Sequence, residues 1–276
     1  MNKLKKLSIP YLVVLLLFIA VPMVVMIALA FTETEGLNFT NATFTWANFE
    51  ALGEYSFIMG VWNSLMYASL ATIICLIIGY PLAYIFSRFK TKSGFMFTLL
   101  LVLPMWSNIL LRTNALAYFF SENNMVTELL SEIGIVWSLP IKGTGLSVVI
   151  GLIMVYLPFM ILPISTVLEK IDTSLYDASS DLGGDPIRTF FKVTIPLSMK
   201  GVTTGIILVF LPCFSGFAVP QIMGNGNIVM LGTIIEGDFI YMDYNSGSLI
   251  AILIVFVIIA ALLVISKVDK EGETLL

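Results

Sequence analysis

The sequence predicts an all-α membrane protein with six transmembrane helices, and both its composition and its hydropathy support this. Of the 276 residues, 58% are hydrophobic and 12% are charged, whereas about a quarter are charged in soluble domains. The mean hydropathy is +0.99. Six apolar runs are long enough to cross a hydrocarbon core, which takes about 20 residues. They cover residues 7–31, 61–86, 95–120, 146–168, 199–220 and 247–266.

These runs divide the chain into segments in a fixed order. We expect an N-terminal transmembrane helix at 1–31, an external loop at 32–60, a core of five further transmembrane helices at 61–266 and a cytoplasmic tail at 267–276. The first run follows the basic stretch MNKLKK and contains Ala28-Leu29-Ala30, which are also features of a cleavable signal peptide. The apolar region of such a peptide is usually about 7–15 residues, so the longer run predicts a retained membrane helix.

The distribution of lysine and arginine predicts the orientation, because these residues are retained on the cytoplasmic side of a membrane protein. Twelve of the 14 basic residues lie before the first run, in the connections after the second and fourth runs, at the start of the fifth run (Lys200), or after the sixth. The opposite side carries Lys142 and ten acidic residues. The sequence therefore predicts that both termini and the connection between the fourth and fifth runs are cytoplasmic.

Prolines inside the apolar runs indicate where helices could be interrupted. They include Pro22, Pro104, Pro158, Pro163 and Pro212. Each removes a backbone hydrogen bond, which is tolerated in lipid only where neighbouring helices or a cavity satisfy the freed carbonyl. Interrupted helices often line transport routes, and a kink that only helps packing is the alternative at each position. Cys75 and Cys213 both fall inside apolar runs, so no structural disulfide is expected.

A polar segment, YDASSDLGGDPIRTFFKVTIPLS at 176–198, interrupts this apolar chain. Ser174, with Asp177 three residues later, predicts a helix N-terminus with a capping box, and Gly183-Gly184 predicts the end of that helix. Asp185-Pro186 predicts the start of a second helix, which we expect to end at Pro196, where the next span begins. Two turns of helix are unstable alone in water, so we expect membrane helices or a partner protein to pack against the first helix.

The same segment resembles the EAA loop of permeases from binding-protein-dependent ABC transporters. That pattern reads Glu-Ala-Ala, three residues, Gly, nine residues, Ile, one residue, Leu-Pro. The matching residues here are Asp177-Ala178-Ser179, Gly183, Val193 and Ile195-Pro196, with substitutions that keep the charge sign and the small size. In that family the short helix before the glycine docks on a cytoplasmic ATPase subunit. The resemblance implies ATPase-coupling roles within the loop at about 173–197 for Leu175, Tyr176, Asp177, Ala178, Asp181, Leu182 and Gly183.

Longer stretches, at 103–120, 155–172 and 211–235, resemble the spermidine/putrescine permeases of that family, specifically the first of two paired permease subunits. The resemblance implies a MetI-like type I ABC importer permease fold in a bacterial plasma membrane, forming half of a translocation path for polyamines. It also implies three kinds of partner: a second homologous permease subunit, two ATPase subunits that hold ATP and Mg, and an extracytoplasmic substrate-binding protein. The chain has no GxxxxGK[ST] phosphate loop, so it is expected to be a transport subunit rather than an enzyme, with no cofactor, metal or nucleic acid of its own.

Candidate residues for the translocation path lie in the apolar runs, which contain no Asp or Glu. Arg112 is the ionisable group well inside a run, so it is either a pathway or gating residue or a structural one that snorkels to water. Asn108 offers hydrogen-bonding groups after Pro104. The rings of Trp106, Tyr156 and Phe214 could attract an organic cation, or could simply pack in the protein.

Three other functions remain open at this stage. The first is an ABC permease for another small cationic or amino-acid-like solute. The second is a membrane-embedded, Mg-dependent lipid-modifying enzyme that uses Asp177, Asp181 and Asp185 at intervals of four residues, although Gly183-Gly184 and Pro186 should break such a helix. The third is a secondary transporter, which usually needs carboxylates inside the membrane. The sequence does not choose between the polyamines.

Overall fold

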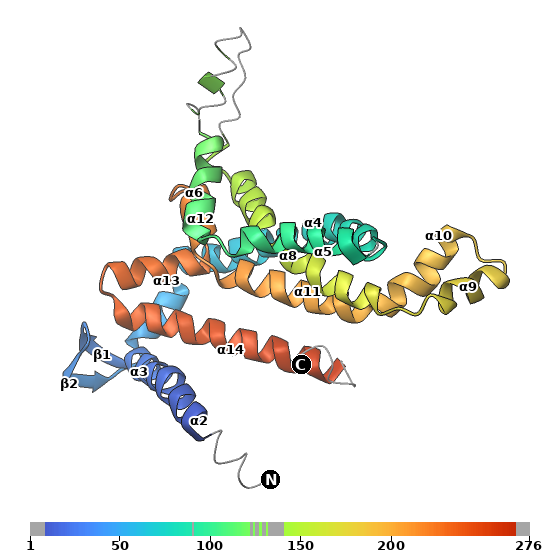
Figure 1. The fold of residues 1–276 in the computed structure, drawn as a ribbon. Coiled ribbons are helices and arrows are strands. Elements are labelled where there is room, and N and C mark those ends of the chain that lie inside the picture. Colours follow the sequence, from blue (N-terminus) through green and yellow to red (C-terminus); the bar gives the residue numbers. More distant parts are fainter. Residues whose placement is uncertain are drawn as a thin grey trace.

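The computed structural model describes residues 9–89, 91–121, 124, 127–128, 131 and 141–268, and they are mostly helical. Figure 1 shows the arrangement of the labelled elements. The first half of the chain contains α2 (Ile9–Leu15), η1 (Leu16–Ala20), α3 (Val21–Ala30), β1 (Thr32–Glu35), β2 (Asn38–Phe44), η2 (Ala47–Gly53), α4 (Tyr55–Ser87), α5 (Thr91–Met105) and α6 (Ile109–Phe119). The second half contains α8 (Gly145–Glu169), α9 (Ser174–Asp181), α10 (Pro186–Thr189), η3 (Phe190–Thr194), α11 (Ile195–Ser215), α12 (Ala218–Met223), α13 (Leu231–Ile240) and α14 (Tyr244–Val268).

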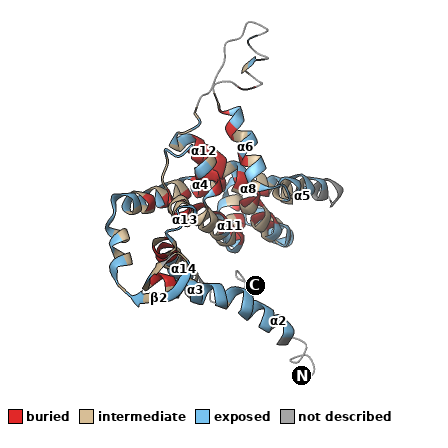
Figure 2. Cartoon of the chain, turned by 90° about the vertical axis from the view of Figure 1, so that its left-hand side faces the viewer, coloured by how far each residue is buried: buried red, intermediate tan, exposed pale blue. Residues whose placement is uncertain are grey.

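Three long helices, α4, α8 and α11, pack against one another and form the core. The buried residues gather on these helices and on α12 (Figure 2). Small residues let the backbones approach closely, which is how membrane helices usually associate. A Cβ atom on Gly201 of α11 would lie 2.8 Å from the carbonyl oxygen of Pro163 on α8, and one on Gly205 would lie 2.7 Å from Sδ of Met160. The core therefore depends on backbone contact as well as on interlocking side chains.

The N-terminal helix is attached at the opposite side of α14 from this core. Helix α3 packs along α14, and the amide of Asn48 donates to the carbonyl oxygens of Ala30 and Thr32, both at 3.0 Å. The amide of Asn245, at the start of α14, also donates to Thr32. Strands β1 and β2 form a short antiparallel hairpin at this point, with Thr32 opposite Phe44. The hairpin is an addition to the all-α prediction, and it lies inside the segment expected to be an external loop.

The hydropathy prediction of six spans agrees in part with the described helices. Five helical stretches are long and apolar enough to cross a membrane: Val13–Ala30, Tyr55–Ser87, Gly145–Glu169, Pro186–Ser215 and Tyr244–Leu263. A sixth is available only if the bent pair Leu99–Met105 and Ile109–Phe119, with 95° between its halves, counts as one span. The apolar run over 95–120 is therefore not one straight helix, because the chain turns between Met105 and Ile109, just after Pro104.

Two further boundaries differ from those expected at the fifth run. Helix α11 ends at Ser215 and Gly216 is extended, so the predicted run to Pro220 is divided between α11 and α12. At its other end, the second polar helix does not stop at Pro196. It continues into α11 through the π-helical turn η3, whose wider hydrogen-bonding pattern accommodates a proline that has no N–H to donate.

We expect Gly201→Ala to lower the free energy of unfolding by about 1–3 kcal/mol, because the added methyl group meets the fixed backbone of α8. The measurement is the midpoint of thermal unfolding of the detergent-purified protein. Gly237→Ala in α13 is the matched control, because a Cβ atom there has nothing within 4 Å and alanine favours helix. Equal midpoints for the two variants would contradict close packing of α11 on α8.

Candidate translocation cavity and coupling segment

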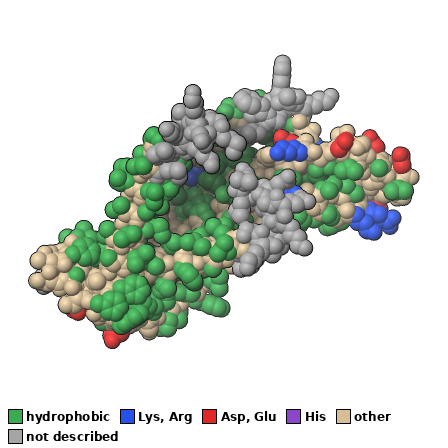
Figure 3. Space-filling view, turned by 90° about the horizontal axis from the view of Figure 1, so that it is seen from below, with side chains coloured by type: hydrophobic (Ala, Val, Ile, Leu, Met, Phe, Trp, Pro, Cys, Tyr) green, Lys and Arg blue, Asp and Glu red, His purple; other side chains and the backbone are tan. Residues whose placement is uncertain are grey.

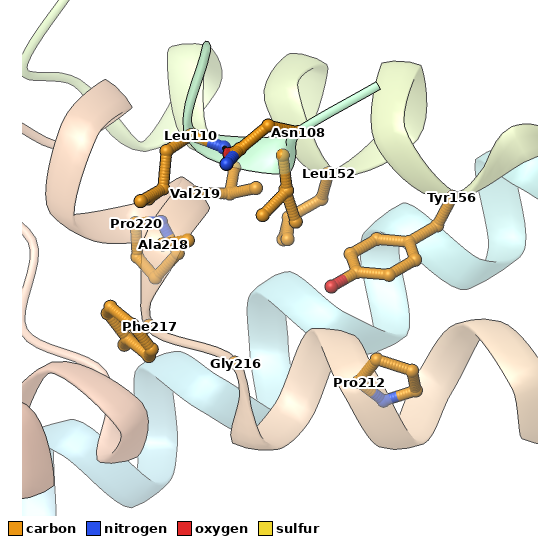
Figure 4. Close-up of a pocket in the computed structure, with 11 residues that line it drawn as sticks. Asn108, Leu110, Leu152, Tyr156, Pro212, Gly216, Phe217, Ala218, Val219 and Pro220 are labelled. Atoms are coloured by element: carbon orange, nitrogen blue, oxygen red, sulfur yellow. Dashed lines mark hydrogen bonds between the residues drawn. The ribbon is translucent and has the colours of Figure 1, made fainter. Parts of the chain in front are cut away.

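A cavity of about 530 Å³ lies where the two helix breaks meet (Figure 4). One break separates α5 from α6, the other separates α11 from α12, and α8 forms the wall between them. Its lining residues are Asn108, Ile109, Leu110, Leu152, Tyr156, Pro212, Gly216, Phe217, Ala218, Val219 and Pro220. A largely apolar cavity with a few polar groups is the usual form of a small-molecule site.

Local hydrogen bonds explain why the chain breaks at these two points. Asn108 caps α6, because its Oδ1 accepts from the backbone N–H of Leu110 at 2.8 Å. On the other side, the N–H of Gly216 donates to the carbonyl oxygen of Pro212 at 2.8 Å and closes the last turn of α11. Helix α12 is then held against α8, because Ser147 Oγ donates to the carbonyl oxygen of Met223 at 2.8 Å.

The structure brings two of the five sequence-predicted pathway residues to this cavity. Asn108 borders it from the start of α6, and Tyr156 reaches it from α8, with its ring directed toward the space beside Gly216 (Figure 4). Trp106 and Phe214 are not among the lining residues. Trp106 is 85% exposed at the bend, whereas Phe214 is buried and stacks on Phe210 with 5.9 Å between ring centroids.

Arg112 occupies a bracing position beside the cavity. Its Nη1 donates to the carbonyl oxygen of Pro104 at 2.6 Å, across the bend between α5 and α6. Its Nε is buried and has no hydrogen-bond partner within the described part of the chain. The bond to Pro104 satisfies a carbonyl at the break in the helix, so this geometry favours a structural role over direct contact with a solute.

Sequence reasoning missed the lining contributed by α12, namely Phe217, Ala218, Val219 and Pro220. The signal was present in the stretch PCFSGFAVP, where Gly216 follows Pro212 by four residues. A proline followed one turn later by a glycine favours the end of a helix. The apolar run continues through this point, so hydropathy alone placed one span across it.

The polar segment forms the two predicted helices, although its first cap differs from the prediction. Ser174 does not cap α9; instead Oδ1 of Asp172 accepts from the backbone N–H of Ser174 at 2.9 Å. This hydrogen bond holds the pKa of Asp172 below its usual value. Gly183 has a φ of 76° and ends α9 as expected. Asp185 Oδ1 accepts from the N–H of Arg188 at 2.6 Å, which confirms it as the cap of α10.

The coupling segment, α9 and α10 with the turn between them, projects at one end of the molecule (Figure 1). Charged side chains gather at this end, beside spans covered by apolar ones (Figure 3). Apolar side chains are exposed there as well: Leu182 is 89% and Ile187 is 72% exposed. A groove of about 330 Å³ runs along α9, bordered by Leu175, Ala178, Ser179, Leu182, Gly184, Arg188, Lys192 and Val193. Exposed leucine and isoleucine beside charge are typical of a surface that a second protein covers.

The alternative of a magnesium-dependent enzyme finds no support in this segment. Asp177 and Asp181 lie on α9, but Asp185 lies beyond Gly183 and caps another helix. Within the described residues, no group of three His, Cys, Asp or Glu side chains is placed to hold a metal ion.

At the opposite end, an acidic pocket of about 250 Å³ lies between η2, α13 and α14, and its lining includes Glu54, Asp238 and Asp243. Helix α13 is outside the candidate membrane spans. Burial raises the pKa of Asp238 to about 6, and the carboxylates of Asp243 and Glu54 add to the effect. The folded protein therefore favours the protonated form of this side chain.

Comparison with known proteins identifies the family. The family model described as "Binding-protein-dependent transport system inner membrane component" matches residues 76–268. This chain belongs to that family. The permease is 36% identical over 241 residues to the spermidine/putrescine transport system permease protein PotB of Haemophilus influenzae, covering 86% of this chain and 84% of that protein. It is 32% identical over 258 residues to PotB of Escherichia coli K12, covering 93% and 94%.

Solved structures share the fold of this permease at low sequence identity. A bacterial ABC transporter involved in the import of the acidic polysaccharide alginate contains a chain that superimposes with a TM-score of 0.78 at 16% identity, covering 97% of this chain and 94% of that one. The alginate transporter in complex with an alginate pentasaccharide-bound periplasmic protein gives a TM-score of 0.77 at 15% identity, with coverages of 97% and 93%. These structures show the shared fold, whereas the family match and the PotB relatives show that the chain is an inner membrane permease component.

We expect Asp238→Asn to stabilise the permease at pH 8 and to make no difference near pH 4. A carboxyl group whose folded-state pKa is raised contributes stability that is complete below about pH 4 and is lost as the pH rises through about 6. Because the carboxyl group is partly exposed, solvent screening reduces the gain to about 1 kcal/mol. Thermal unfolding of the purified proteins from pH 4 to 8 measures the stability difference between Asp238→Asn and the wild type. Asp181→Asn, on the exposed side of α9, is the control. A constant difference between Asp238→Asn and the wild type at all pH values would contradict the assignment.

Proposed function

We propose that the chain is a permease subunit of an ATP-driven importer of polyamines, spermidine or putrescine, and that it forms half of the translocation path. The observation that carries the proposal is the identity of 32–36% to two PotB permeases across 86–93% of the chain. Their names state a spermidine/putrescine transport system. The alginate transporters share only the fold, so their polysaccharide substrate says nothing about the solute carried here.

The chemistry of the cavity is compatible with a polyamine, which is a flexible chain of methylene groups with spaced ammonium groups. The apolar walls can contact the methylene groups, and the rings of Tyr156 and Phe217 can each attract a cation by about 0.5–2 kcal/mol. Asn108 offers a side-chain amide. Because no carboxylate is among the lining residues, binding would be weak, which suits a solute that has to leave again. Selectivity would then rest mainly on the substrate-binding protein.

The proposed assembly contains a second homologous permease subunit, two ATPase subunits and an extracytoplasmic substrate-binding protein. The solved alginate transporter bound to its periplasmic protein supports this, because its chain has the same fold. ATP and Mg would be held by the ATPase subunits, which would dock on the coupling segment. Within it, Leu175, Tyr176, Asp177, Ala178, Asp181, Leu182 and Gly183 are the proposed coupling residues. The exposed side chains of Leu182 and Ile187 support docking there.

We also propose six spans with both termini cytoplasmic, counting the bent pair α5 and α6 as the third. Segment 1–31 would contain the first span, 32–60 would be external, 61–266 would form the permease core and 267–276 a cytoplasmic tail. Charge at the helix ends supports this orientation. Lys170, Arg188 and Lys192 lie near α9, whereas Glu54 and Asp238 lie at the other end, near η2 and α13.

Uptake measurements test the proposed substrate. Cells that contain the full transporter should accumulate radiolabelled spermidine or putrescine only when this chain is present, and an excess of either unlabelled polyamine should reduce uptake at least tenfold. Arginine, lysine and ornithine should not compete. Strong competition by a basic amino acid, together with no uptake of either polyamine, would instead favour a permease for amino-acid-like cations.

Labelling with a membrane-impermeant maleimide tests the proposed orientation and the docking surface together. With Cys75 and Cys213 replaced by alanine, Leu182→Cys should react only from the cytoplasmic side, and the ATPase subunit should protect it, because Leu182 is the most exposed apolar side chain of the coupling helix. Thr40→Cys, on the exposed strand β2, is the matched control and should react only from outside. Reaction of Leu182→Cys from outside would overturn the orientation.

A further inference from the structure

The end of α4 nearest α9 is joined to the coupling segment by aromatic contacts. The ring of Phe190, in η3, meets the rings of Tyr80 and Tyr84 edge to face, with centroids 5.8 and 5.2 Å apart. The hydroxyl of Tyr80 lies 2.7 Å from Oγ of Ser198 in α11. These contacts fix the start of α11 against α4, but they do not involve α9.

Arg88 makes the contact to α9 itself. It follows α4 directly, and its backbone N–H closes the last turn of that helix on the carbonyl oxygen of Ile85. Its guanidinium carbon lies 4.2 Å from the ring centroid of Tyr176 in α9 and 5.1 Å from that of Tyr84 in α4. Its Nη2 also donates to the hydroxyl of Tyr84 at 3.3 Å. One cation thus contacts an aromatic ring on each of the two helices.

Helix α9 needs such a contact because it has little else to hold it. It has eight residues and no buried side chain, and a helix of that length is unstable alone. The hydroxyls of Ser179 and Thr189, 2.7 Å apart, connect it to α10. On the side facing α4, Tyr176 is half-buried, whereas its neighbours Leu175 and Asp177 are exposed. The stack of Tyr176 on Arg88 is thus the side-chain contact that joins α9 to the end of α4.

We propose that Arg88 is a positioning residue that transmits movement from the coupling helix α9 to α4. This inference rests on the proposed coupling of α9 to an ATPase subunit. Since α4 packs on both α8 and α11, a displacement passed to α4 reaches the helices around the cavity. The planar guanidinium group suits the role, because it can lie flat against a ring, whereas the compact ammonium group of lysine cannot stack in this way.

The test compares Arg88→Lys with Tyr176→Leu in the complete transporter, measuring solute uptake and ATP hydrolysis in the same proteoliposomes. Arg88→Lys should assemble and hydrolyse ATP, while the solute moved per ATP should fall at least about fivefold in both variants, the lower end of typical coupling effects. Tyr176→Phe keeps the ring that contacts Arg88, so it should move more solute per ATP than Tyr176→Leu does. Tyr241→Leu is the matched control for Tyr176→Leu, because it removes an exposed ring just after α13, away from the coupling segment.

The double variant Arg88→Lys/Tyr176→Leu shows whether the two residues act through their mutual contact or independently. If Arg88 and Tyr176 act through each other, the combined variant should lose no more than either single variant, because the interaction is already absent. Additive losses, or wild-type transport per ATP in Arg88→Lys and Tyr176→Leu, would overturn the proposal. Arg88→Lys could lower the amount of assembled complex. In that case the test is the solute moved per ATP by Tyr176→Leu compared with Tyr176→Phe, because these variants leave α4 unchanged. Absence of ATP-driven uptake in the wild type would instead refute the proposed function.

Discussion

The rest of the structure depends on the need to bond backbone polar groups inside the protein wherever the chain lies in hydrocarbon. Two helices nevertheless break, close to Pro104 and Pro212. The carbonyl of Pro104 accepts from Ser107 Oγ and from Arg112 Nη1, and that of Pro212 accepts from the N–H of Gly216. Both breaks border the same cavity, with Asn108 on the α6 side and Gly216 on the α11 side. The cavity thus occupies the place where interrupted helices are tolerated.

Hydropathy predicted the helical segments well because the bilayer selects for that local property, but it could not predict their bends. The run over 95–120 stays apolar through the turn at Trp106, and only Pro104 and the helix-capping residue Asn108 signal a break. The directions in which the side chains at and after the turn point depend on the 95° angle between α5 and α6, which hydropathy does not give. Asn108 borders the cavity, whereas Trp106 in the same bend lies exposed. Phe214 packs inside the protein, two residues before the break at Gly216.

The coupling segment was more predictable because short-range rules govern it. Gly183 takes the left-handed conformation that a sharp helix end favours, and Asp185 caps the next helix. The predicted cap of α9 was wrong, because Ser174 is the first residue of the helix and its N–H donates to Oδ1 of Asp172. The stack of Arg88 on Tyr176 joins two segments far apart in the chain, and only the packing of α4 reveals it.

The helices of the core pack tightly, whereas the cavity lining and α9 offer or make only weak contacts. ATP-driven transport would depend on both. In the core, Gly201 and Gly205 bring the backbone of α11 into close contact with α8. The cavity has no carboxylate in its lining, and α9 is held by a stacked cation and a pair of hydroxyls instead of a buried ion pair. Each 1.4 kcal/mol of added affinity would lengthen the residence of a solute about tenfold at constant association rate. A strong carboxylate site would therefore trap a polycation, whereas the weak contacts in the cavity would let the solute leave. The contacts of α9 would let it change position relative to the tightly packed core.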